Sequence, residues 1–325
     1  MFRYNRGKPL LLAALAASAA VSAATAAAAG PEYKIVSTIA VKDNQPAGVL
    51  QVDAQARRLY VGGNGVIEIF DVDSGQRIGE IAVPGPVAGL TLAPAIGKGF
   101  ASTATGNRVI AFDLASLSQV GSATVAGAPR DLAYDAKSNR LFVASAGGIL
   151  TALDAASLKP AGKLALGGDL RDAESDGRGH LFVADKAGKS LRTIDTVALR
   201  SLGDMPVWPG GGPTSLVNDE KERRIYVTTD NGRMIIMDPD SGQMIGYVPI
   251  GTGEGGMAVN FMPGRFARMF VPTADGKLTI LQNAKLTASV ESAPAVSIKG
   301  IAVASDPKTG RVFLPGDAQI IVMGQ

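Results

Sequence analysis

One short element occurs seven times along this 325-residue chain. It consists of a basic residue followed by an apolar run around an aromatic residue. The seven aromatic residues are Tyr60, Phe100, Phe142, Phe182, Tyr226, Phe270 and Phe313. Successive aromatic positions are 40, 42, 40, 44, 44 and 43 residues apart. A period of about 40 to 45 residues is typical of folds that repeat one four-stranded sheet. The repeat therefore predicts an all-β chain of seven such units.

Each repeat before the last contains four segments with the composition of β-strands. In the first repeat these are residues 48–53, 58–63, 66–71 and 77–83, which are rich in β-branched residues and bounded by turn-forming residues. The third segment ends in Asp in five of the repeats, at Asp71, Asp113, Asp154, Asp195 and Asp238. Gln282 occupies this place in the sixth repeat. The pattern predicts four-stranded antiparallel sheets.

The two ends of the repeat region complement each other. The last repeat has only one strand-like segment after its aromatic element, residues 319–323, and an extra segment, residues 33–41, precedes the first repeat. Pairing these two segments would complete the last sheet and cover edges that an open array leaves unpaired. We therefore expect a seven-bladed β-propeller whose ring is closed by the N-terminal strand. An open β-solenoid is the structural alternative.

The first 29 residues have the features of a Sec signal peptide. Arg3, Arg6 and Lys8 precede an apolar run over residues 10–21, and small residues follow at 26–29. The alternative is a membrane anchor, but the apolar run is shorter than the roughly twenty residues that a span needs. We expect cleavage near residue 29, a single propeller domain over residues 30–325, and a periplasmic or secreted protein without a membrane span.

Charge and cysteine content narrow the function classes. The chain has 32 Lys and Arg against 29 Asp and Glu, and without Arg3, Arg6 and Lys8 the two counts are equal. No basic stripe with interleaved aromatic residues is present, so we expect no nucleic-acid partner. The absence of Cys removes disulfides, thiol catalysis and thiolate metal sites.

Motifs that could carry chemistry have structural interpretations. His180, the only His, occupies the position of the basic residue in the repeat. The run Gly251-Thr252-Gly253-Glu254-Gly255-Gly256 matches a phosphate-binding pattern, but a strand rather than a helix is expected after it. With one His and no Cys, His-based metal clusters and Ser-His-Asp triads lack their usual parts. We predict no catalytic residue, no metal site and no cofactor.

One group of residues remains as a candidate binding site. In a propeller, the connections between sheets and the hairpins between second and third strands gather on one face around the channel. The candidate residues expected there are Arg130, Asp131, Arg171, Asp172, Trp208, Arg233 and Lys299. As a site, the Arg and Asp residues would hold an anionic or zwitterionic ligand, with Trp208 as a stacking lid or partner anchor. As structure, the same residues would bridge neighbouring blades at a solvated rim.

The repeat as a whole is similar to a known family. Arg58-Leu59-Tyr60-Val61, a hairpin containing Gly and Asn, an apolar strand ending in Asp71, and the turn Ser74-Gly75 resemble the YVTN family of seven-bladed β-propellers. The resemblance covers about residues 31–325 and implies a secreted bacterial or archaeal repeat protein. The second repeat and the sixth, with Gln282, depart from the pattern. WD40 propellers are a weaker match because no third strand ends in Trp-Asp.

The sequence leaves two main hypotheses on function. The first is an exported, non-catalytic propeller, expected to be a monomer, that recognises an envelope protein, a peptide or a small ligand on its funnel face. The second is a lactonase-like or other hydrolase that uses Asp131, Asp172 and Glu254 with a divalent metal ion. A redox-partner propeller is a remote third possibility, because the chain has no recognisable cofactor ligand.

Overall fold

The structure is a computed structural model, and the residues it describes are 32–42, 48–103, 105–251, 260–262, 268–273, 276–282, 289–291 and 298–325. The chain divides into two compact units, Met1–Glu32 and Tyr33–Gln325, and all of the described strands belong to the second. The expected signal peptide lies outside the described residues. A single 3-10 turn, η1 (Pro94–Ile96), interrupts the strands of the described part. None of the described residues belongs to a helix with the length and apolarity that crossing a bilayer requires.

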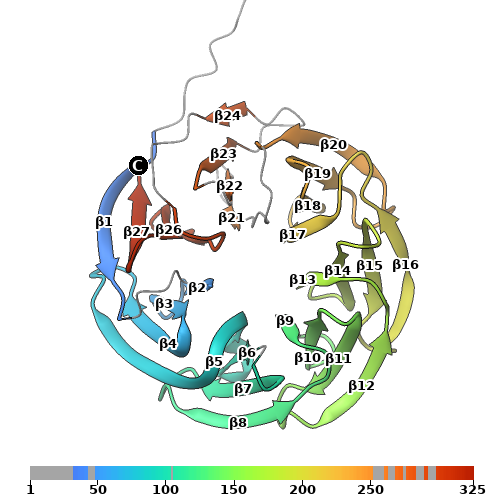
Figure 1. The fold of residues 1–325 in the computed structure, drawn as a ribbon, viewed down its shortest axis with the longest axis horizontal. Helices are drawn as coiled ribbons and strands as arrows, with labels where there is room; N and C mark the ends of the chain where they lie inside the picture. Colours follow the sequence, from blue (N-terminus) through green and yellow to red (C-terminus); the bar gives the residue numbers. More distant parts are fainter. Residues whose placement is uncertain are drawn as a thin grey trace, which may run out of the picture. The chain divides into compact units, whose positions relative to one another are not determined.

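The described strands form antiparallel sheets in which neighbouring strands are consecutive in the chain, except where β1 pairs with β27 (Figure 1). The first sheet has seven strands: β2 (Val49–Asp53), β3 (Arg58–Gly62), β4 (Asn64–Asp71), β5 (Arg77–Ala93), β6 (Lys98–Thr103), β7 (Arg108–Asp113) and β8 (Gln119–Thr124). A four-stranded sheet follows, made of β9 (Pro129–Asp135), β10 (Arg140–Ser145), β11 (Ile149–Asp154) and β12 (Pro160–Ala165). The prediction of an all-β chain with four-stranded antiparallel sheets is confirmed.

Four further sheets of four strands make up the rest of the described part. The next sheet contains β13 (Leu170–Ser175), β14 (His180–Asp185), β15 (Ser190–Asp195) and β16 (Arg200–Pro206). It is followed by β17 (Pro213–Asp219), β18 (Arg224–Thr229), β19 (Arg233–Met237) and β20 (Met244–Pro249). Then come β21 (Asn260–Met262), β22 (Arg268–Pro272), β23 (Leu278–Gln282) and β24 (Ser289–Glu291). The last sheet has the order β1 (Lys34–Ala40), β27 (Gln319–Gly324), β26 (Arg311–Pro315) and β25 (Ala304–Asp306).

Strand β5 departs from the sequence prediction. A strand was expected over residues 77–83, but β5 continues to Ala93 and pairs first with β4 and then with β6. The chain bends at Pro84-Gly85-Pro86 without leaving the ladder, because Gly85 adopts a φ of 134°, which disfavours other residues. The N–H of Val87 also donates to the carbonyl of Gly63 at 3.0 Å. Two expected blades are therefore joined in one seven-stranded sheet.

The N-terminal strand pairs with the C-terminal one. In the antiparallel register of β1 and β27, Lys34 lies opposite Gly324 and Ala40 opposite Gln319. Just before β1, the buried ring of Tyr33 lies edge-on to Phe270, with 5.1 Å between ring centroids. The expected pairing of residues 33–41 with residues 319–323 is confirmed.

Consecutive sheets pack against each other through apolar clusters. All seven aromatic residues of the repeat are buried, at 0 to 1% exposure. One cluster joins Leu50 and Leu59 of the first sheet to Phe313 and Ile320 of the last. The first strands also contact one another, in the order β5, β9, β13, β17, β21, β25, β2 and back to β5. The apolar part of the repeat therefore provides the packing between neighbouring sheets.

Among the described residues, the basic residue of four repeats forms a hydrogen bond to the following repeat. The donors are Arg58, Lys98, Arg140 and Arg311, and the acceptors are backbone carbonyls in a turn of the next repeat. The bond joins Arg140 to Thr196 at 2.6 Å and Arg311 to Val72 at 2.9 Å. Because the donor is charged, each bond is stronger than one between neutral groups. In these repeats the element combines an aromatic core residue with a polar contact to the next repeat.

Candidate binding cavity

A cavity of about 530 Å³ lies among the first strands of the sheets. Residues of β2, β5, β9, β13 and β17, with residues 301–303, line it; we call it the inner cavity. A Cβ atom at Gly89 would lie 2.8 Å from the Cα of Asp131, so a glycine is needed where β5 approaches β9. The volume falls within the range of about 300 to 1,000 Å³ that is typical of small-molecule sites.

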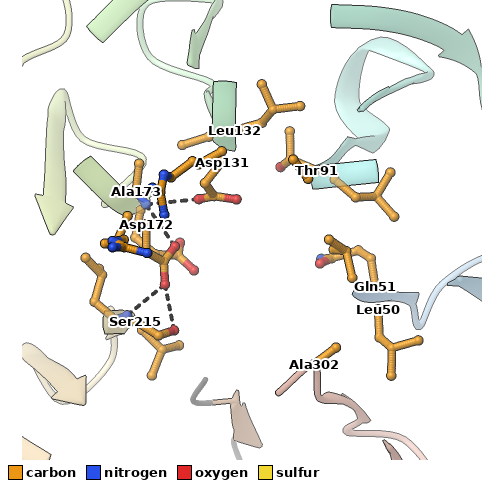
Figure 2. A pocket seen from close by; sticks show the side chains of 18 of the residues that line it. Leu50, Gln51, Thr91, Asp131, Leu132, Asp172, Ala173, Ser215 and Ala302 are labelled. Carbon is orange, nitrogen blue, oxygen red and sulfur yellow. Dashed lines mark hydrogen bonds between the residues drawn. The ribbon is translucent and has the colours of Figure 1, made fainter. Parts of the chain in front are cut away.

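The walls of the inner cavity differ in polarity. Figure 2 shows Asp131 and Asp172 on one side, with Leu50 and Ala302 across the open space. The charged wall comes from β9 and β13, where the sequence has Arg-Asp at equivalent positions. A ligand in the inner cavity would therefore meet charged groups on one side and largely neutral ones on the other.

Arg130 and Arg171, near the starts of β9 and β13, share one carboxylate. Nε and Nη2 of Arg171 donate to Oδ2 of Asp169 at 2.9 and 2.5 Å, whereas Nη2 of Arg130 lies 3.5 Å from Oδ1. Burial lowers the pKa of Arg130, and the positive charge of Arg171 lowers it further. No described residue accepts a hydrogen bond from the Arg130 guanidinium. Two guanidinium groups beside the inner cavity therefore share Asp169 as their ion-pair partner among the described residues.

Asp131 and Asp172 tie their strands to the next sheet. Oδ2 of Asp131 accepts the N–H of Ala173 at 3.0 Å. Oδ2 of Asp172 accepts the Ser215 hydroxyl at 2.6 Å and the N–H of Leu216 at 2.8 Å (Figure 2). The bonds to the Asp172 carboxylate are charge-assisted and removed from bulk water, which makes them stronger than contacts at a solvated rim. Both carboxyl groups thus bridge neighbouring sheets at the wall of the inner cavity.

The two aspartates also interact with each other. Burial raises the pKa of Asp131 well above its usual value, and the negative charge of Asp172 and a hydrogen bond between the two carboxyl groups raise it further. Of the two carboxyl groups, Asp131 is therefore the one that the fold favours in the protonated form. Keeping one proton on such a pair avoids placing two like charges side by side.

Glu174 is a third acidic residue in the inner cavity, and sequence reasoning missed it. Burial raises its pKa to about 8, with further contributions from the negative charges of Asp172 and Glu220. No described residue forms a hydrogen bond with its carboxyl group. Asp172 and Glu174 both line the inner cavity, although the pairing of β13 with β14 is irregular between Leu170 and Ala173. A second acidic residue two positions after Asp172 was the signal in the sequence that could have identified Glu174.

Four of the seven candidate residues line the inner cavity: Arg130, Asp131, Arg171 and Asp172. Trp208 is not among the lining residues and is 74% exposed. Arg233 donates to the carbonyl of Pro209 and lies 5.3 Å from the ring centroid of Tyr247. It therefore supports the loop that carries Trp208. Lys299 is exposed and also does not line the inner cavity.

The other residues considered for chemistry lie apart from this group. Nδ1 of His180, at the start of β14, lies 2.9 Å from Oδ2 of the buried Asp176, and neither residue lines the inner cavity. Within the described ranges, no group of three or more His, Cys, Asp or Glu residues is arranged to hold a metal ion. Glu254 and residues 252–256 of the Gly-rich run lie outside the described residues.

The pKa of Glu174 predicts a pH dependence of stability that a variant at this residue reduces. Because the folded-state pKa of about 8 exceeds the ordinary value of 4.5, the folded protein keeps a proton that the unfolded chain has released. Stability therefore falls as pH rises from about 4.5 to 8. Allowing for the partial exposure of the side chain, we expect the free energy of unfolding to drop by on the order of 3 kcal/mol across this window.

Urea denaturation at pH 5 to 9 measures this effect. Glu174→Gln is expected to make the decline with pH shallower and to leave the part that the raised pKa of Asp131 contributes. Glu222→Gln, at an exposed position, is expected to preserve the whole decline. Identical profiles for wild type and Glu174→Gln would show that the Glu174 carboxyl is not held neutral by the fold.

Comparisons with known proteins add no identification. No family model matches the sequence, and none of the curated proteins compared with it matches either. The proposed function therefore rests on the geometry and charge of the inner cavity.

Proposed function

We propose that this protein is a non-catalytic binding protein that takes a small ligand with an anionic group into the inner cavity. The observation that carries the proposal is Arg130, a cation that lines a cavity of ligand size and lacks a hydrogen-bond acceptor among the described residues. A partly buried guanidinium without an acceptor is unfavourable, and a carboxylate or phosphate group would satisfy it with two parallel bonds.

The proposal includes the architecture that surrounds the inner cavity. A seven-bladed propeller is supported by the sevenfold repeat, by the pairing of β1 with β27 and by the succession of contacts between first strands. Such a ring would place the inner cavity at the channel. The similarity of Arg58-Leu59-Tyr60-Val61 and its counterparts to the YVTN repeat supports membership of that family. The basic and apolar segments within residues 1–29 support export to the periplasm or beyond.

Isothermal titration calorimetry with simple anions tests the binding function. The probes are acetate, butyrate, succinate and methylphosphonate at pH 7. We expect at least one to bind, and Arg130→Gln to weaken it about tenfold or more, because a charge-assisted contact in a partly dry site is lost.

A matched control separates this contact from general charge. Arg200→Gln removes an Arg whose side chain is 63% exposed and which does not line the inner cavity. It should leave binding unchanged. Equal weakening by both variants would mean that the anion responds to overall charge, and unchanged binding in Arg130→Gln would reject the proposed site.

A hydrolase remains the second candidate, and one observation favours it. The Glu174 carboxyl has a pKa of about 8, which suits an acid or base that works near neutral pH. Against this, Asp172 already accepts hydrogen bonds from Ser215 and Leu216, which leaves it poorly placed to act as a nucleophile. Turnover of a lactone or ester that Glu174→Gln abolishes would favour the hydrolase over the binding protein.

A further inference from the structure

Glu174 differs from Asp131 and Asp172, the other acidic residues of the inner cavity, because it forms no hydrogen bond to a neighbouring sheet among the described residues. Asp131 and Asp172 accept hydrogen bonds from the next strand, at Ala173, Ser215 and Leu216. No such donor among the described residues reaches Glu174. Its carboxyl group lines the inner cavity and is available to a ligand.

The surroundings of Glu174 favour a positive charge. The negative charges of Asp172, on the same strand, and Glu220, in the turn after β17, add to burial in raising its pKa to about 8. The pKa of Asp131 on β9 is also raised, and Arg130 and Arg171 lie at the starts of their strands. The negative charges of Asp172 and Glu220, which disfavour a carboxylate at Glu174, attract a cation to the same place. A neutral hydroxyl would gain only a single hydrogen bond there.

The inner cavity therefore offers two sites that prefer ligand groups of opposite charge. Arg130 and Arg171 suit an anion, Glu174 suits a cation, and Leu50 and Ala302 line part of the opposite wall. We infer that the ligand is a small aminocarboxylate, such as an amino acid or short peptide, with its anionic group on Arg130 and its ammonium group on Glu174. This inference rests on the proposed function, to which it adds the chemical class of the ligand.

Binding of an ammonium group would be linked to proton release. In the empty cavity at pH 7 the Glu174 carboxyl keeps its proton, because its pKa is about 8. When the ammonium group binds, Glu174 gives that proton to solvent and the resulting carboxylate pairs with the ammonium. The affinity for an aminocarboxylate should therefore rise between pH 6 and pH 8.5, where Glu174 releases its proton more readily.

Calorimetry with two matched series tests the inference. The first series is glycine, β-alanine, 4-aminobutyrate, 5-aminopentanoate and 6-aminohexanoate. The second contains hydroxycarboxylates of the same chain lengths. At one length or more, the amino compound should bind about tenfold tighter than its hydroxy counterpart. Glu174→Gln should abolish this preference and the rise of affinity with pH, whereas Arg130→Gln should weaken both series.

The possible outcomes distinguish this inference from the proposed function. If both series bind equally and Glu174→Gln changes neither, the ammonium site is wrong, while anion binding at Arg130 stands. If neither series nor the simple anions bind, both proposals fail. Thermal unfolding at pH 6 checks that Glu174→Gln is folded, since Gln resembles the neutral acid that the fold already holds.

Discussion

Asp172→Asn is expected to destabilise the protein by about 3 to 5 kcal/mol at pH 7, although it removes only one oxygen atom. The two carboxylate oxygens accept the N–H groups of Ala173 and Leu216 and the hydroxyl of Ser215. An Asn has one acceptor oxygen, and its NH₂ group would face at least one of these donors. A bridge between two sheets is thereby replaced by unsatisfied donors.

Asp131→Asn provides the matched comparison. Burial and the charge of Asp172 raise the pKa of Asp131 and so favour its neutral form. An Asn can accept from the N–H of Ala173 and donate toward Asp172 as a neutral acid would. We expect a change of less than about 1 kcal/mol at pH 7. Urea denaturation of both variants measures the difference. Equal costs for the two substitutions would contradict the assignment of the proton to Asp131.

Removal of residues 33–41 is expected to prevent stable folding. This segment carries Tyr33 and Ile39, which are 2% and 5% exposed, and the whole of β1. Loss of two large core residues corresponds to more than about 6 kcal/mol, which is comparable to the total stability of many domains. The deletion would also leave the outer edge of β27 unpaired, which promotes aggregation.

Substitutions on the exposed face of the same strand are the control. Ile35 and Val36 are each 51% exposed, so Ile35→Thr and Val36→Thr should change stability by less than about 0.5 kcal/mol. Circular dichroism and size-exclusion chromatography compare the three variants with wild type. A monomeric deletion variant with an unchanged melting temperature would show that β1 is dispensable for the fold.

Strand positions could be predicted from the sequence because their cause is local. The segment predicted at residues 58–63 is β3 (Arg58–Gly62), and that at 319–323 is β27 (Gln319–Gly324). Runs of β-branched and aromatic residues, bounded by turn residues within a few positions, determine such strands. The pairing of β1 with β27 could also be predicted, because a count of strand-like segments showed one extra at one end and one missing at the other.

The sequence contains a second signal that recurs with the repeat. The first strand of five repeats ends in a buried Asp whose carboxylate accepts hydrogen bonds from the backbone of the following turn, in most cases from two N–H groups. These residues are Asp53, Asp135, Asp176, Asp219 and Asp306. A carboxylate in this position stabilises the turn. Its recurrence at the period of the aromatic residues would have strengthened the strand boundaries.

The candidate site could be predicted only in part, because it depends on how neighbouring sheets pack against each other. Arg130 and Asp131 stand at the same repeat position as Arg171 and Asp172, so their proximity followed from the repeat. Trp208 attracted attention as a lone aromatic residue in a Gly/Pro loop, but no local rule shows whether such a loop covers the inner cavity. Glu174 was overlooked because its role depends on burial and on Glu220, which belongs to the next repeat.

A crystal structure with the tightest-binding aminocarboxylate tests the proposed binding site most directly. We predict that the ligand occupies the inner cavity, with carboxylate oxygens about 2.7 to 3.2 Å from the Arg130 guanidinium and its nitrogen at a similar distance from the Glu174 carboxyl. A ligand bound outside the inner cavity, for example on the exposed ring of Trp208, would contradict the proposed site.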